Sequence, residues 1–178
     1  MPSDEQHPPA RVTKPFYERR LPHFQGDGKV LFVTFSTFRY WILPPEAREI
    51  ALRHCVHDNG RKMELYCAVV MPDHVHLLYR LLTDANGNLY GLTEIVGTIK
   101  SVSAHVIAKA LGRTEHVWLR ESYDHVLRRN EGPAETADYI CHNPVRKGLC
   151  RSCDEYPYLW RSWVDDEKNA GEGACGTL

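Results

Sequence analysis

The chain has 178 residues, 43% of them hydrophobic and 25% charged, with a formal net charge of −1. The length and composition fit one globular domain with an ordinary core. The net charge argues against a strongly basic nucleic-acid-binding protein. No apolar run approaches the roughly 18 residues of a membrane span. The polar N-terminus lacks the apolar stretch of a secretory signal, so we expect a cytoplasmic location and no membrane partner.

The apolar pattern predicts alternating strands and helices after a flexible, proline-containing N-terminal arm at residues 1–25. The pattern would continue to residue 163 as one domain and end in a disordered tail at 164–178. Strands are predicted over 30–35, 64–70 and 74–82, and a fourth strand or extended segment over 117–128. Helices are predicted over 46–58 and 93–111, and a last one from about Pro133 through Ile140.

The last predicted helix should end by Asn143, because the residue before a proline avoids helical geometry. The resulting order, β-α-β-β-α-β-α, is a split β-α-β arrangement. It predicts an α+β, ferredoxin-like fold, in which helices cover one face of an antiparallel sheet.

His74 and His76 are separated by one residue in the third predicted strand. Side chains at positions i and i+2 of a strand point to the same face, so the two imidazoles would lie side by side while Val75 enters the core. Two neutral imidazoles on a stiff strand form half of a site for a divalent metal. A pair of exposed histidines without a metal fits the same pattern.

Further polar residues lie at the end of the last predicted helix, where Tyr139 and Asn143 are four positions apart and share a helix face. With that face against the open side of the sheet, Tyr139 would stand beside the histidine pair and Asn143 could supply an oxygen ligand. Two imidazoles and an amide oxygen suit Mg²⁺ or Mn²⁺. A tyrosine hydroxyl beside a metal-bound phosphate is a nucleophile for phosphoryl transfer.

Simpler roles exist for both residues. Tyr139 could be an aromatic residue at the edge of the core. Asn143 could cap a short following helix that Gly148 closes.

The six cysteines are scattered along the chain, and in a cytosolic protein we expect free thiols. Cys150 and Cys153 have the spacing of a zinc-ligand pair. No second pair follows at a matching separation, so a structural zinc is not expected.

Positive charge is concentrated in the second half of the chain. Residues 99–151 carry nine Lys and Arg against six Asp and Glu, whereas residues 152–178 carry two against six. A difference of this size is a weak signal, because most charged stretches are solvated faces.

Three blocks of sequence stand in an order and spacing that one family shares. They are MPDHVHLL at 71–78, VWLRESYDHVLR at 117–128 and YICHNPVRKGL at 139–149. Together they resemble the single-tyrosine HUH transposases, and the last block is similar to the tyrosine helix of their REP-associated branch. The resemblance extends over roughly residues 30–160.

This resemblance implies a metal-dependent enzyme that binds single-stranded or hairpin DNA, nicks it and rejoins it through a 5′-phosphotyrosine. Carried over residue by residue, Tyr139 would be the nucleophile, and His74, His76 and Asn143 would hold Mg²⁺ or Mn²⁺. Insertion-sequence members of the family have glutamine where this chain has the shorter Asn143. Either a monomer or a homodimer is compatible with the sequence.

DNA recognition by such a protein should combine phosphate contacts with stacking of unpaired bases on aromatic rings. Trp118 and Trp160 could stack on bases, although burial in the core is the favoured interpretation. The basic residues expected to contact DNA are Lys100, Arg113, Arg120, Arg128, Arg129, Arg146 and Lys147, with Arg11, Lys14, Arg19 and Arg20 of the arm.

Two alternative functions use the same residues. One is a ferredoxin-like nucleic-acid-binding module that does not cleave. The other is a metal-dependent hydrolase that activates water with Asp73, His74 and His76. Within the transposase hypothesis, Tyr123 on the fourth predicted strand is the rival nucleophile.

Overall fold

The computed structural model describes residues 28–128 and 130–163. The predicted arm with its four basic residues, the predicted tail and Arg129 lie outside this range.

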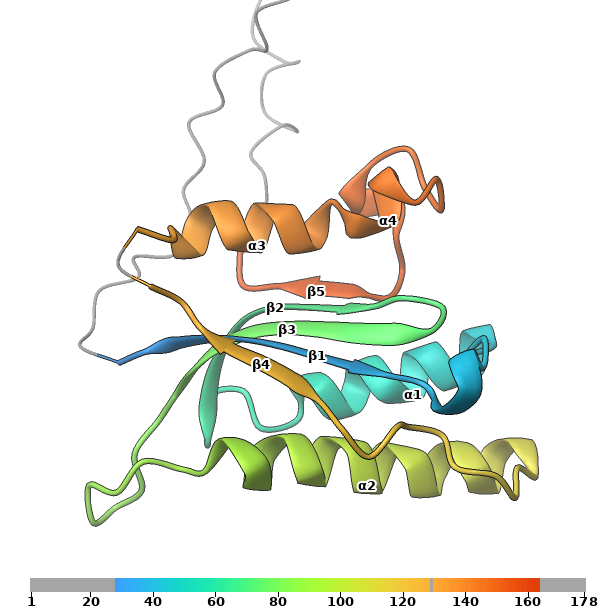
Figure 1. Ribbon diagram of the computed structural model, residues 1–178, viewed down its shortest axis with the longest axis horizontal. Helices are drawn as coiled ribbons and strands as arrows, with labels where there is room; N and C mark the ends of the chain where they lie inside the picture. The colour runs from blue at the N-terminus through green and yellow to red at the C-terminus, as the bar shows by residue number, and fades with distance from the viewer. Residues whose placement is uncertain (1–27, 129, 164–178) are drawn as a thin grey trace, which may run out of the picture. The chain divides into compact units, whose positions relative to one another are not determined.

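The described residues form one antiparallel sheet with strand order β4-β1-β3-β2-β5 (Figure 1). The strands are β1 (Val30–Ser36), β2 (Met63–Val70), β3 (His74–Leu81), β4 (Tyr123–Val126) and β5 (Leu159–Arg161). The helices are α1 (Pro45–Val56), α2 (Leu92–Leu111), α3 (Pro133–Cys141) and α4 (Asn143–Arg146), with short 3-10 turns at Phe38–Tyr40 and Cys153–Glu155.

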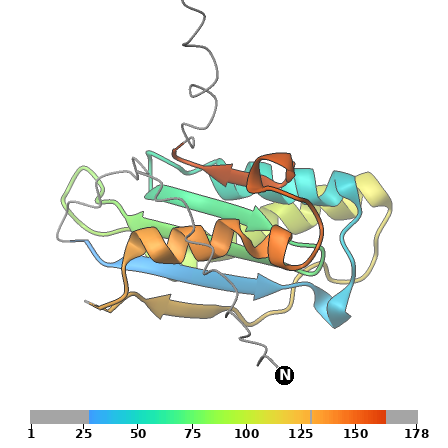
Figure 2. The same ribbon diagram turned by 90° about the horizontal axis from the view of Figure 1, so that it is seen from above.

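The predicted ferredoxin-like α+β fold is confirmed. The two helices of the split β-α-β arrangement, α1 and α2, cover one face of the sheet, and α3 with α4 lies across the face that they leave open (Figures 1 and 2). Contacts of α3 with β2 and β3 place it over the centre of the sheet. None of the described helices combines the length and apolar character that crossing a lipid bilayer demands.

The alternation of side chains along β3 divides this strand between two apolar clusters. Val75, Leu77 and Tyr79 are buried in the main core beneath α1 and α2. Leu78 belongs to a smaller cluster on the other face, where Ile140 of α3 is also buried. Because these apolar residues fix which way the strand faces, His74 and His76 point to the α3 side.

Several predicted boundaries agree with the structure to within a few residues. Gly112 ends α2 in the left-handed conformation with φ 62°, as a helix-terminating glycine does. Regular β4 is shorter than the predicted segment 117–128, because residues 117–122 form an irregular strap that is held by Leu119 N–H donating to the Ser36 carbonyl. The edge strand β5 was not predicted, and it pairs with β2.

The chain turns at His142, between α3 and α4. The N-cap position of α4 is His142, and Asn143 is the first residue inside the helix, where its side-chain oxygen accepts from Arg146. Gly148 follows with φ 69°. The capping role considered for Asn143 is therefore absent here.

Candidate active site

The two imidazoles meet on the open face of the sheet. Nε2 of His74 lies 3.1 Å from Nε2 of His76, and the backbone of β1 runs antiparallel beside them, with Thr34 opposite His76. The other ring nitrogens are also occupied. Nδ1 of His74 lies 2.6 Å from Oδ1 of Asp73, and Nδ1 of His76 lies 2.8 Å from Oγ1 of Thr34.

This pattern of contacts suits a bound cation. A carboxylate only accepts hydrogen bonds, so Nδ1 of His74 donates to Asp73, and in the neutral form of the ring Nε2 carries the free lone pair. If Nδ1 of His76 donates to Thr34 in the same way, two lone pairs face each other and repel unless a proton or a cation lies between them. A carboxylate or hydroxyl behind each imidazole is the usual support of a metal-binding histidine.

The electrostatic environment keeps His76 neutral. Burial, the neighbouring His74 and the positive charge of Arg146 lower the pKa of His76 to about 3, against the opposing effect of Asp73. A neutral imidazole is the form that binds metal, so His76 is in its ligand form throughout the neutral range.

A third protein ligand beside the two histidines would have to be a side chain other than His, Cys, Asp or Glu. Among residues 28–128 and 130–163, no group of three or more His, Cys, Asp or Glu side chains could hold an ion. Asn143 is buried, with 9% of its surface exposed. Its Oδ1 accepts a hydrogen bond of 2.7 Å from Nη2 of Arg146, and its Nδ2 has no hydrogen-bond partner within the described part of the chain.

Arg146 connects the predicted nucleophile to this group of residues. Its guanidinium carbon lies 3.8 Å from the centroid of the Tyr139 ring, which is a stacked cation–π contact. The same guanidinium donates to Asn143, and its charge acts on His76. Tyr139 itself is 57% exposed, so its side chain is accessible to a large ligand. Within the part of the chain that the structure describes, no hydrogen bond or ring contact joins Tyr139 to either histidine.

Tyr123, the rival nucleophile, also lies on this face. It stands opposite Thr34 in the β1–β4 pairing and is 61% exposed. Its ring makes an edge contact with Phe32 at 6.5 Å, and Phe32 in turn lies 5.5 Å from the His76 ring. Both tyrosines therefore lie on the side of the sheet that carries the histidines, and this location alone does not decide which of them is the nucleophile.

Besides Arg146, two of the predicted DNA contacts have partners inside the protein. Lys100 Nζ donates to the carbonyl oxygens of Arg120 and Glu121 and to Oγ of Ser122, and burial lowers the pKa of Lys100. Arg113 stacks on Trp41, with its guanidinium carbon 3.9 Å from the ring centroid. Both side chains hold structure together in the free protein.

The other predicted contacts are open to solvent. Arg120, Arg128, Arg146 and Lys147 are all exposed. Arg120 lies in the strap and Arg128 lies just beyond β4. Arg146 is the last residue of α4, and Lys147 follows it directly.

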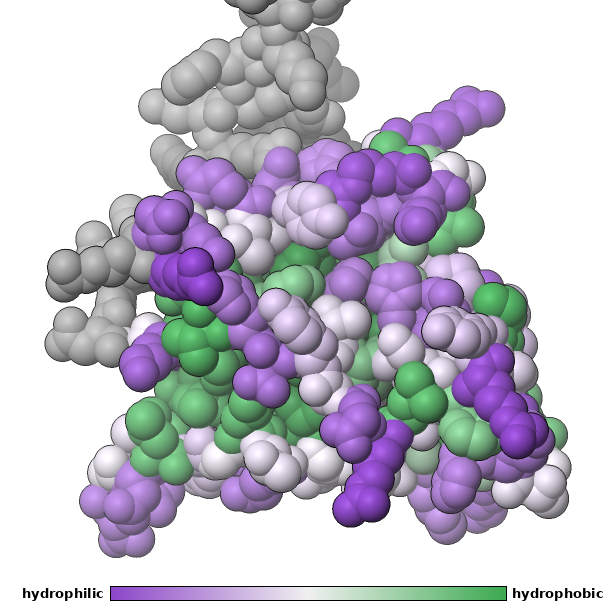
Figure 3. All heavy atoms as spheres, viewed as in Figure 1, coloured by the Kyte–Doolittle hydropathy of each residue, from purple (hydrophilic) through white to green (hydrophobic). Residues whose placement is uncertain are grey.

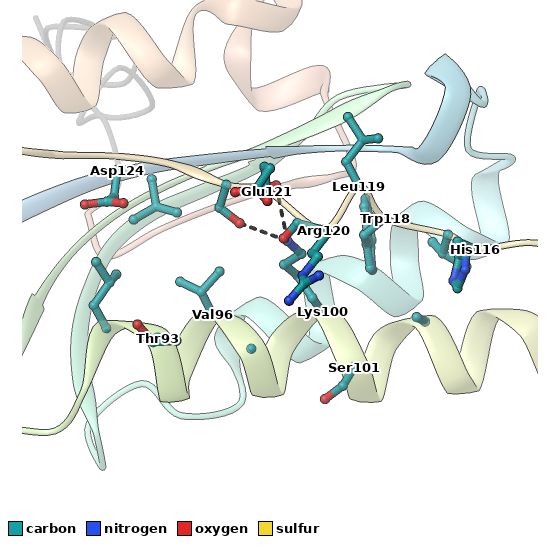
Figure 4. Close-up of a pocket in the computed structure, with 16 residues that line it drawn as sticks. Thr93, Val96, Lys100, Ser101, His116, Trp118, Leu119, Arg120, Glu121 and Asp124 are labelled. Atoms are coloured by element: carbon teal, nitrogen blue, oxygen red, sulfur yellow. Dashed lines mark hydrogen bonds between the residues drawn. The ribbon is translucent and has the colours of Figure 1, made fainter.

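A concave region lies on the opposite face of the sheet, away from the two histidines. It is a hollow of about 520 Å³ between α2 and residues 116–124, and Lys100 reaches across it to the strap (Figure 4). Figure 3 shows apolar side chains reaching the surface between β4 and α2. Trp118 is buried at this hollow and donates through Nε1 to Oγ of Ser103, which confirms its predicted place in the core.

Sequence reasoning missed the supporting roles of Thr34 and Arg146. Thr34 is the one polar residue in the apolar strand segment VLFVTF, and this departure from the pattern is a signal that could have revealed it. Arg146 was expected only to contact DNA, and its stacking on Tyr139 depends on the turn at His142. The five described cysteines are free thiols.

Comparison with known proteins identifies relatives of this chain. A family model described as "Transposase IS200 like" matches residues 29–142. A protein of Haemophilus influenzae named as a candidate REP-associated tyrosine transposase is 26% identical over an alignment of 104 residues, and the match covers 53% of this chain. The match spans 57% of the length of that curated relative.

A solved structure of a transposase gives the same fold. A REP-associated tyrosine transposase bound to a REP hairpin superposes with a TM-score of 0.56 at 20% identity, covering 82% of each chain. A candidate transposase from Deinococcus radiodurans has a TM-score of 0.43 at 21% identity, covering 63% of this chain and 87% of the other.

Proposed function

This chain belongs to the family of IS200-like transposases, and from that premise we propose that it binds hairpin or single-stranded DNA, nicks it, and rejoins it through Tyr139. The observation that carries the proposal is the pair of histidine Nε2 atoms 3.1 Å apart, each imidazole supported from behind by Asp73 or Thr34. The solved relative bound to a REP hairpin supports DNA hairpins as the partner.

In this proposal, His74 and His76 hold a divalent cation, Mg²⁺ or Mn²⁺, with Asn143 as the third protein ligand. Bound there, such a cation neutralises charge on the scissile phosphate and fixes its orientation. The two imidazole Nε2 atoms 3.1 Å apart and the buried amide oxygen of Asn143 are the features that fit it.

The hydroxyl oxygen of Tyr139 attacks the phosphorus, and the bond from phosphorus to the 3′-oxygen breaks. The phenol loses its proton to solvent and the departing 3′-oxygen gains one, so the products are a 5′-phosphotyrosine and a free 3′-hydroxyl. Because the number of phosphoester bonds is unchanged, a 3′-hydroxyl can attack the phosphotyrosine and rejoin a strand without ATP. The 57% exposure of Tyr139 leaves room for DNA.

DNA would be held mainly by charge. We propose that Arg120, Arg128, Arg146 and Lys147, which are exposed, contact phosphates of the hairpin or of the adjoining single strand. All the proposed catalytic and metal-binding residues come from one chain, and this arrangement is compatible with a monomer or a homodimer.

The decisive experiment compares Tyr139→Phe with Tyr123→Phe. Each variant is incubated with labelled hairpin DNA and Mg²⁺, and the products are separated on a denaturing gel. We expect covalent protein–DNA adduct from the wild type and from Tyr123→Phe, and none from Tyr139→Phe. Adduct formation by Tyr139→Phe would remove Tyr139 from the role.

The role of the histidines is tested separately. We expect His76→Ala to abolish nicking while hairpin binding, measured by fluorescence anisotropy, stays within about threefold of the wild type, because phosphate contacts supply most of the affinity. Normal nicking in EDTA would contradict the metal site. Cleavage without an adduct would favour the hydrolase, and binding without any cleavage would favour the binding module.

A further inference from the structure

Arg146 has three relations to the proposed site that a phosphate contact alone does not require. Its guanidinium stacks on the ring of Tyr139 at 3.8 Å and donates to Oδ1 of Asn143 at 2.7 Å. Its charge is also among the causes that lower the pKa of His76. One side chain thus touches the proposed nucleophile and the proposed third ligand, and its field reaches the histidine pair.

The contact with Asn143 occupies the atom that a cation would use. Oδ1 is the only oxygen of that side chain, and a guanidinium–oxygen hydrogen bond is strengthened by the full positive charge. Nδ2 is buried with no hydrogen-bond partner among the described residues. The hydrogen bond from Arg146 is therefore the polar contact that orients the amide in the DNA-free protein.

Electrostatic repulsion opposes the binding of two positive groups to this one oxygen. A divalent cation that binds Asn143 has to displace Arg146 from Oδ1 or accept its repulsion at close range. The stack on Tyr139 ties the same guanidinium to the phenol, so a displacement of Arg146 also changes the surroundings of the nucleophile.

We propose that Arg146 is a positioning residue that holds Asn143 and Tyr139 in the DNA-free protein and competes with the cation for Asn143. When DNA enters, its phosphates draw the guanidinium away from Oδ1 of Asn143, which frees that oxygen for the cation, while the guanidinium stays stacked on the Tyr139 ring. Metal binding and DNA binding would then reinforce each other through one side chain. This inference rests on the proposed function of the site.

Binding of Mn²⁺ to the DNA-free full-length protein tests the competition, with free Mn²⁺ followed by its EPR signal. We expect Arg146→Leu to bind Mn²⁺ about fivefold more tightly than the wild type, because a competing donor and a nearby positive charge are both removed. Arg146→Lys should gain less, since it keeps the charge and loses the planar fork.

Matched variants separate this effect from a general change of charge. Lys147→Gln removes the same charge from the next position and should leave the Mn²⁺ affinity within about twofold of the wild type. In an Asn143→Ala background, Arg146→Leu should give no gain. An unchanged or weaker Mn²⁺ affinity in Arg146→Leu, or a gain that persists without Asn143, would overturn the proposal.

The positioning of Tyr139 has its own measurement. At saturating DNA and Mn²⁺, Arg146→Leu should slow single-turnover adduct formation by about tenfold or more, whereas its hairpin Kd should change by less than about threefold. Partial rescue of the rate by Arg146→Lys is expected. Loss of affinity with a normal rate would show that Arg146 is only a phosphate contact. A wild-type protein that binds no Mn²⁺ would instead contradict the proposed function.

Discussion

Thr34 faces His76 across β1 and β3, and its hydroxyl lies 2.8 Å from the ring nitrogen that points away from His74. The hydroxyl fixes the rotation of that imidazole. We predict that Thr34→Val weakens Mn²⁺ binding and slows adduct formation by about 10- to 100-fold, as loss of such a supporting contact generally does.

Thr34→Ser is the matched control for this prediction. It retains the hydroxyl and should stay near the wild type in both measurements. Since Thr34 does not reach the DNA in the proposal, hairpin binding should be similar in the two variants. If Thr34→Val bound Mn²⁺ as tightly as Thr34→Ser, the hydroxyl would have no part in the site.

At the scale of elements, a buried hydrogen bond holds the strap against α2. Ser103 is fully buried and accepts from the indole N–H of Trp118 at 2.9 Å, while its own hydroxyl donates to the carbonyl of Ile99. We predict that Ser103→Ala lowers the free energy of unfolding by about 1–3 kcal/mol, because it leaves the indole N–H buried and unpaired. Urea denaturation measures this change.

An exposed serine on the same helix provides the comparison. Ser101→Ala removes a hydroxyl that donates to the carbonyl of Thr98 at the surface, and the stability of this variant should stay within about 0.5 kcal/mol of the wild type. Equal effects of the two substitutions would show that the contact with Trp118 does not stabilise the strap.

The strands and helices that could be predicted are those with a long apolar pattern. A compact run of β-forming apolar residues marked β1, and helical spacing followed by Gly112 marked α2. The three residues of β5 are too few to show a period, and their pairing with β2 depends on the chain returning across the sheet. The turn between α3 and α4 is equally local, since it occupies the single residue His142 between the two helices.

The sequence predicts the arrangement of site residues only where they belong to a single strand or helix. His74 and His76 share a face because they share a strand, and this follows from spacing alone. The contacts of Thr34 and Arg146 require a register between strands and an angle between helices, which the sequence pattern does not specify. For the same reason, the partners of Lys100 and Arg113 could not be foreseen.

For the whole molecule, the basic residues fall into two groups, and substitutions in the two groups should change the salt dependence of hairpin binding differently. Arg120 and Arg128 are exposed, whereas the Arg113 side chain is 15% exposed and stacks on Trp41. We predict that Arg120→Gln and Arg128→Gln each reduce the slope of log affinity against log salt by about 0.7–0.9, the loss of one phosphate contact. Hairpin titrations at several salt concentrations provide the slope.

Arg113→Gln should behave in the opposite way. It removes a cation–π contact and an ion pair with Glu115 at 3.2 Å, so thermal stability should fall while the salt dependence of binding is retained. An equal change of slope in Arg113→Gln and Arg120→Gln would mean that Arg113 leaves Trp41 when DNA binds.

The placement of both imidazoles on a single strand makes the activity vulnerable to one kind of mutation. Inserting one codon between His74 and His76 would send the two rings to opposite sides of the sheet, because neighbouring side chains alternate. The apolar layers on both sides could absorb much of the shift at the strand end. Descendants of such a gene could therefore keep the architecture and the affinity for DNA while losing strand cleavage in a single event.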